Sequence, residues 1–106
     1  MAKYLVQASY TAEGLKGLLK DGGSKRRESI EKLAGSVGGK LESVYYAFGK
    51  HDVIAIVDLP DNVSAAAVSM AIGASGAVTN TMTVLVTPEE IDAAVKKSPA
   101  YTPPGR

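Results

Sequence analysis

The chain contains no cysteine, no tryptophan and only one histidine among its 106 residues. Without cysteine there can be no disulfide, no thiolate metal site and no cysteine nucleophile. This composition fits a reducing compartment, and we expect the protein to be cytoplasmic. A lone histidine also falls short of the ligand set of a transition-metal site, so we expect neither a metal nor another cofactor.

Long apolar runs and a strong charge of one sign are missing as well. No stretch approaches the ~20 apolar residues that a membrane span needs, and no signal-peptide pattern opens the chain. The net charge is only +1, which argues against nucleic-acid binding. Residues 1–50 carry +4 and residues 51–106 carry −3, so either both surfaces are simply solvated or a basic face meets an acidic face of another copy.

Apolar periodicity predicts the secondary structure. A period-two pattern indicates a strand at 3–10, and apolar runs bounded by turn residues indicate strands at 41–48, 53–59 and 78–86. Helical spacing indicates three helical segments, at 12–37 (broken at Gly22 and Gly23, with Ser24 capping its second half), at 63–74 and after Thr87. The last begins with a capping box and leads into a proline-rich tail. We therefore place one domain at 1–97 and an extended tail at 98–106.

This order of elements is the split β-α-β pattern of ferredoxin-like α+β domains, with an extra C-terminal helix. The strands are then antiparallel, in spatial order 4-1-3-2, with helices on one face. An exposed second face should alternate apolar with polar residues. In the central hairpin both faces are apolar instead, with Ile54 and Ile56 opposite Val53 and Ala55. We therefore expect a second sheet to cover it, giving a dimeric α+β barrel, that is, a homodimer or a larger assembly.

Two finer side-chain assignments accompany this prediction. In the second strand we expect one face to carry Leu41, Tyr45 and Ala47, and the other to carry Val44, Tyr46 and Phe48. In the alanine-rich helix we expect one apolar face made of Val63, Ala67, Met70 and Ala74.

Polar residues from three segments should meet at one end of this sheet. The first strand ends at Tyr10, the hairpin turn holds His51 and Asp52, and the fourth strand begins near Thr79 and Asn80. We predict a site here, with His51 and Asp52 as candidate catalytic residues and the other three as ligand-binding residues. Imidazole titrates near neutrality and a carboxylate orients it, which suits general acid/base chemistry. The alternative is a solvated turn, in which Asp52 bonds the backbone.

Three further polar features have two interpretations each. Tyr46 either lines a ligand cavity or packs as ordinary core, and we take it as a ligand-binding candidate. Asp58 either emerges at the sheet edge or is buried, and a buried carboxylate needs a partner. The run Lys25-Arg26-Arg27 at the start of a helix either is a solvated basic face or holds a phosphate or carboxylate.

Five segments, in this order and spacing, resemble the GYD domain family: 3–17, 45–49, 57–61, 74–78 and 85–90. The Gly-Tyr-Asp motif that names the family falls at the hairpin turn, which here reads Gly49-Lys50-His51-Asp52. Gly49 and Asp52 match, and His51 stands at the tyrosine position. The resemblance implies a dimeric α+β barrel.

The sequence favours a small-ligand-binding or oligomeric accessory domain. The alternative is a small cofactor-independent enzyme of the cyclase, isomerase or oxygenase type, with His51 as acid/base. Expected partners are other copies of the chain and a small molecule, with no nucleic acid and no membrane.

Overall fold

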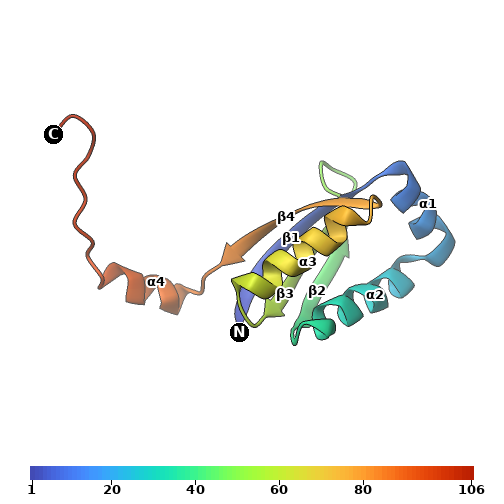
Figure 1. Ribbon diagram of the computed structural model, residues 1–106, viewed down its shortest axis with the longest axis horizontal. Coiled ribbons are helices and arrows are strands. Elements are labelled where there is room, and N and C mark those ends of the chain that lie inside the picture. The colour runs from blue at the N-terminus through green and yellow to red at the C-terminus, as the bar shows by residue number, and fades with distance from the viewer.

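The computed structural model describes residues 1–106 and has one four-stranded sheet with four helices (Figure 1). In chain order the elements are β1 (Ala2–Tyr10), α1 (Ala12–Asp21), α2 (Gly23–Ser36), β2 (Lys40–Tyr46), β3 (Val53–Leu59), α3 (Asn62–Ala74), β4 (Val78–Leu85) and α4 (Pro88–Val95). The strands run antiparallel in the order β2-β3-β1-β4, which confirms the predicted α+β topology. None of the helices has the length and apolarity that crossing a membrane requires.

The crossover from β1 to β2 breaks where the sequence predicts. Thr11 caps α1 by accepting the backbone N–H of Gly14. Gly22 then adopts φ of 81°, a left-handed conformation that favours glycine, and separates α1 from α2. The predicted Ser24 cap is wrong, because α2 already begins at Gly23 and has no side-chain cap.

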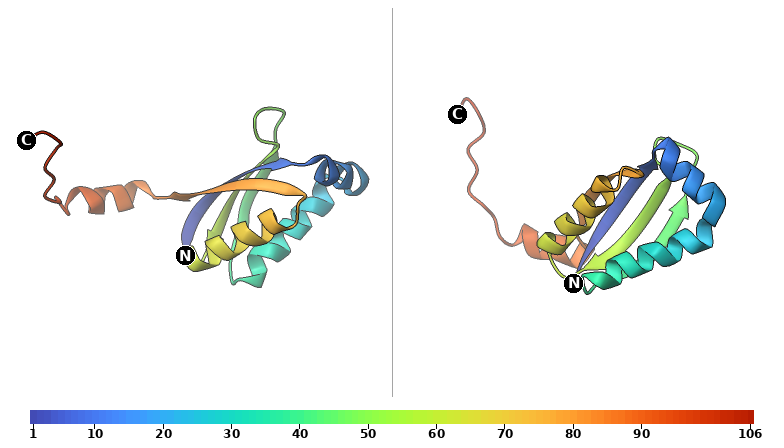
Figure 2. Two further views of the ribbon diagram at one scale, coloured as in Figure 1. Left: turned by 45° about the horizontal axis from the view of Figure 1, so that its top comes forward. Right: turned by 45° about the vertical axis from the view of Figure 1, so that its right-hand side comes forward.

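Helices α2 and α3 lie on one side of the sheet, and the loop between β2 and β3 rises on the other side (Figure 2). The core between helices and sheet is a cluster of seven buried residues, built around Tyr4 and Leu59. From α3 the buried residues are Ala65 and Val68. The predicted apolar face of α3 is therefore wrong: Val63 and Met70 point to solvent, because this helix is apolar on nearly every side and periodicity alone does not select a face.

Strand β2 also differs from the prediction. Its register against β3 shifts between Leu41 and Ser43, so that Leu41 pairs with Val57 and lies on the helix side together with Val44. The strand ends at Tyr46 rather than Phe48. Phe48 consequently sits in the turn, where its side chain is fully exposed.

The face of the sheet away from the helices, which we call the open face, is uncovered in a single chain. Its central residues, identified from the strand register, are Leu5, Gln7, Tyr45, Ile54, Ile56 and Thr83. Tyr45 is 71% exposed and Ile54 36% exposed. The apolar surface that the sequence predicts on this face is therefore present and without a partner in the chain.

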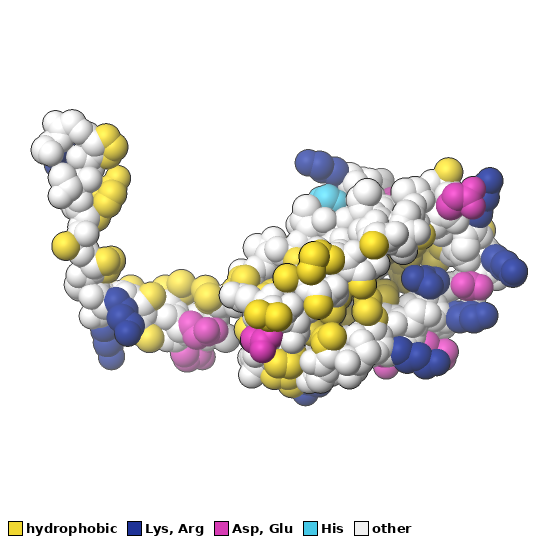
Figure 3. Space-filling view, in the orientation of Figure 1, with side chains coloured by type: hydrophobic (Ala, Val, Ile, Leu, Met, Phe, Trp, Pro, Cys, Tyr) yellow, Lys and Arg dark blue, Asp and Glu magenta, His cyan; other side chains and the backbone are white.

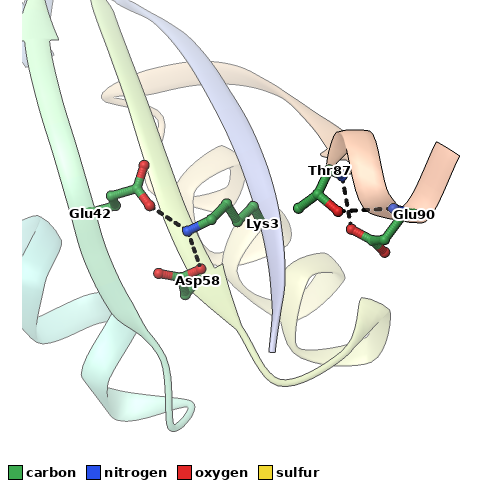
Figure 4. A network of polar contacts seen from close by, with 5 residues as sticks. All are labelled: Lys3, Glu42, Asp58, Thr87 and Glu90. Atoms are coloured by element: carbon green, nitrogen blue, oxygen red, sulfur yellow. Dashed lines mark hydrogen bonds and ion pairs between the residues drawn. The ribbon is translucent and has the colours of Figure 1, made fainter. Parts of the chain in front are cut away.

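At one end of the open face Lys3 donates hydrogen bonds to the carboxylates of Glu42 and Asp58 (Figure 4). The bond to Asp58 measures 3.0 Å, and Asp58 is buried. Asp58 therefore has the partner that a buried carboxylate needs. The hydrogen bond to Glu42, followed by that to Asp58, raises the pKa of the Lys3 ammonium.

The cap of α3 predicts a dependence of stability on pH. The carboxylate of Asp61 accepts the backbone N–H of Ser64 at 2.8 Å, and this bond lowers the pKa of Asp61 below its ordinary 3.8. Because the pKa of Asp61 is lower in the folded protein than in the unfolded chain, the cap contributes its full stabilisation above pH 3.8. This stabilisation is lost as the pH falls through the folded-state pKa. The stability advantage of wild type over Asp61→Asn, which caps without titrating, should shrink between pH 5 and pH 3 in urea titrations. An advantage that is constant over this range would contradict the assignment.

Candidate functional site

An apolar cleft lies between α2 and α3, above β1 and β3. Its volume is about 110 Å³, and 13 of its 15 lining residues are hydrophobic. The strands supply the floor, including Ala8, Val53 and Ala55, and the helices supply the walls, including Leu33 and Ile72. Figure 3 looks onto this side of the molecule, where hydrophobic side chains gather over α3 and in the hollow beside it. This cleft is not predictable from the amino-acid sequence, because it depends on the distance between the two helices.

Arg26 is the only charged residue that lines the cleft. Its neighbours in the basic run have acidic partners: Lys25 pairs with Asp21 at the end of α1, and Arg27 pairs with Glu31 in α2. Arg26 is half-buried and has no carboxylate partner. A guanidinium in such surroundings is a ready binding group for an anion, since it can donate two parallel hydrogen bonds to one carboxylate.

Two tyrosines lie at the same end of the cleft as Arg26. Tyr10 lines the cleft from the end of β1. The Tyr46 hydroxyl donates to the carbonyl oxygen of Gly23 at 3.0 Å, next to the start of α2. Burial, followed by the proximity of Tyr10, raises the pKa of the Tyr46 phenol, and the charge of Arg26 acts in the opposite direction. The Tyr46 phenol therefore stays neutral near pH 7, and its one O–H is used in the bond to Gly23.

The hairpin turn is held against β1 by Asp52. Its carboxylate accepts the backbone N–H of Tyr10 at 2.8 Å, and its own N–H donates to the carbonyl oxygen of Ala8 at 2.8 Å. His51 is half-buried and takes part in no hydrogen bond or ion pair. The structure thus brings Asp52 to the backbone of β1 and not into a bonded pair with His51. Their catalytic role stays a prediction.

Thr79 and Asn80 reach the same end of the sheet but on opposite faces. Asn80 exchanges two hydrogen bonds with Ser69 of α3, at 2.9 and 3.1 Å, and so ties that helix to β4. Thr79 lies on the other face, where its hydroxyl donates to the carbonyl oxygen of Ser9. Neither residue lines the cleft. Of the predicted site residues, Tyr10 lines it and Tyr46 lies beside its polar end.

A signal for Arg26 is present in the sequence once helix spacing is applied. Lys25 and Arg27 each have an acidic residue four positions away, at Asp21 and Glu31. Arg26 has only Gly22, Gly23, Ser29 and Ile30 at the three- and four-residue spacings where helix side chains meet. The middle residue of the run is therefore the one left for an external anion.

The molecule contains no group of three or more His, Cys, Asp or Glu side chains that could hold a metal ion. The polar residues that line the cleft are Arg26, Ser29 and Tyr10, which offer one positive charge and hydrogen-bonding groups beside an apolar surface.

Comparison with known proteins agrees with the resemblance seen in the sequence. The family model described as GYD domain matches residues 4–95, which is most of the chain. No curated protein and no solved structure matches. The match runs from within β1 to the end of α4, so it takes in nearly the whole sheet, both walls of the cleft and the hairpin turn. The chain is a member of the GYD domain family.

Proposed function

We propose that this protein binds a small ligand whose apolar body fills the cleft between α2 and α3 and whose anionic group pairs with Arg26. The observation that carries the proposal is the position of Arg26, an unpaired guanidinium on the wall of a cleft that is otherwise almost wholly apolar. Concave, mainly apolar sites with a few converging polar groups are the usual form of small-molecule sites.

The size of the cleft limits the apolar part of the ligand. An engineered apolar cavity of about 150 Å³ accepts one benzene molecule. The present cleft, at about 110 Å³, accommodates a single small ring or a short alkyl chain. The ligand class that fits is therefore a small carboxylic acid with a short alkyl or single-ring body. For such a ligand we expect a dissociation constant of about 0.1–1 mM.

We also propose that the functional unit is a homodimer whose two open faces pack together. A compact monomer of 11.0 kDa exposes about 5,600 Å², whereas this chain exposes 7314 Å². The excess of about 1,700 Å² is more than the ~800 Å² that each partner buries in a standard interface. Only 12 of 106 residues are buried, so a single chain has little core of its own.

Replacing Arg26 tests the ligand proposal. Hexanoate is a suitable probe, because its chain fits the cleft and its carboxylate can reach the guanidinium. Arg26→Gln should weaken hexanoate binding, measured by isothermal titration calorimetry, about 10- to 100-fold, because a hydrogen bond to a charged group contributes about 1.5–3 kcal/mol. Arg27→Gln is the matched control, since Arg27 carries the same charge one residue away but pairs with Glu31 outside the cleft.

The control variant should bind hexanoate within about twofold of wild type. Equal losses in the two variants would show that only the general charge of α2 matters. No loss in Arg26→Gln would remove Arg26 from the site and with it the anionic part of the proposal.

A further inference from the structure

The C-terminal arm, residues 87–106, extends from β4 beyond the end of the sheet (Figure 1). All of its residues are exposed except Pro103, which is half-buried. The arm accounts for the elongated shape of the chain, whose radius of gyration is 16.8 Å, against about 13 Å for a compact domain of this length. Nothing in the chain itself covers it.

The first part of the arm nevertheless has strong local signals for a helix. Thr87 and Glu90 form a complete capping box at the start of α4, with reciprocal bonds of 3.1 and 2.9 Å (Figure 4). Pro88 occupies the first turn. A helix of eight residues is marginal in water even with good caps, and its stability then has to come from packing.

One side of α4 carries exposed apolar residues that could make such packing contacts. Ile91, Ala94 and Val95 follow one another at helical spacing and form an apolar stripe. Ile91 is 50% exposed and Val95 72% exposed. Tyr101, farther along the arm, is 76% exposed. The stripe therefore lacks a partner in a segment whose local sequence specifies a helix.

We infer that this stripe packs against a second copy of the chain, so that each arm clasps the partner subunit. This inference rests on the proposed homodimer, because the arm continues from the surface that forms it. Leu85, the last residue of β4, pairs with Lys3 and belongs to the open face. α4 begins only three residues later, so a copy seated on the open face lies directly beside the arm.

The exposed area also favours a second copy as the occupant. The excess of about 1,700 Å² is about twice what one side of a standard interface buries, which is enough for both an open-face contact and an arm. In a twofold dimer both arms make the same contact, so one stripe in the sequence contributes twice.

The first test uses the full chain with two helix-compatible substitutions, Ile91→Glu near the start of α4 and Val95→Lys near its end. Both charges suit the helix dipole and the net charge is unchanged, so α4 itself should persist. The double variant should raise the dimer dissociation constant, measured by analytical ultracentrifugation, about a hundredfold. Ala93→Glu is the control, because Ala93 is exposed on the opposite side of α4 and should leave dimerisation unchanged.

The second test asks whether the arm reaches another molecule. Dimers of mixed ¹⁴N- and ¹⁵N-labelled chains are treated with a short amine-reactive cross-linker, and links from Lys96 or Lys97 are analysed by mass spectrometry. Links that join one labelled and one unlabelled peptide are expected. The arm contact alone would be overturned by the following result: the wild-type protein is a dimer, the double variant dimerises equally well, and no mixed links form. A wild-type protein that is monomeric would overturn the arm contact together with the homodimer, and hexanoate binding would report separately on the cleft.

Discussion

Replacing Ile54 by lysine should dissociate the proposed open-face dimer into monomers. Ile54 lies near the centre of the open face, paired with Gln7 on one side and Tyr45 on the other. In a twofold face-to-face dimer the new ammonium is buried without a partner, and it occurs twice. We expect the dimer dissociation constant to rise at least a hundredfold, because even about 1.5 kcal/mol per copy gives this factor.

Met70→Lys is the matched control for this experiment. Met70 is 69% exposed on the outer side of α3, so the substitution makes the same change of charge on an apolar residue away from the open face. Sedimentation velocity should show a dimer for Met70→Lys and a monomer for Ile54→Lys. If the Ile54 variant also remains a dimer, the open face is not the interface.

Substituting Gly14 by alanine should destabilise the folded protein by about 3 kcal/mol. An added Cβ at this position lies 2.0 Å from the carbonyl oxygen of Ala77 and 2.9 Å from the ring of Tyr10. The same carbonyl accepts the backbone N–H of Thr11 at 2.9 Å. To relieve the clash, α1 has to move away from Ala77, the residue before β4, which breaks this bond and displaces Tyr10 at the polar end of the cleft.

Gly17 supplies the control from the same helix. It lies one turn after Gly14, and an added Cβ meets no atom within 4 Å. Gly17→Ala should therefore stabilise the protein by about 0.5–1 kcal/mol, because alanine favours the helix over the unfolded chain. Urea denaturation of both variants measures the contrast. Similar effects of the two substitutions would mean that α1 does not pack closely on Ala77.

The sequence predicts the topology because the turn chemistry is local and strong. Gly22, the capping box that starts at Thr87 and the apolar strand segments each mark an element without reference to the rest of the chain. It is harder to predict which face of a strand or helix each side chain occupies. A bulge in β2 moves Leu41 to the helix side, and the evenly apolar α3 gives no periodicity from which to choose Ala65 and Val68 over Val63 and Met70.

The site is predicted less well than the fold for a related reason. The sequence places polar residues at one end of the sheet, and Tyr10, Asp52 and Asn80 do lie there. However, Asp52 hydrogen-bonds to the backbone of β1 and Asn80 to Ser69 of α3, so both side chains hold neighbouring elements together. The cleft is formed by apolar residues whose pattern is that of an ordinary core, and its charged group, Arg26, belongs to a basic run whose pattern is that of a solvated surface. Only the distance between α2 and α3 distinguishes a cleft from a filled core.

The most direct test of ligand binding in the cleft is an NMR titration of the ¹⁵N-labelled protein with hexanoate, alongside the uncharged hexan-1-ol. Hexanoate should cause saturable shifts of the backbone amides of Ala55, Val68 and Ile72 and of the Arg26 Nε–H, with a dissociation constant of about 0.1–1 mM. Hexan-1-ol should move the same backbone amides with at least tenfold weaker affinity, because it cannot pair with the guanidinium. Shifts confined to the hairpin turn around His51, or none that saturate, would contradict binding in the cleft.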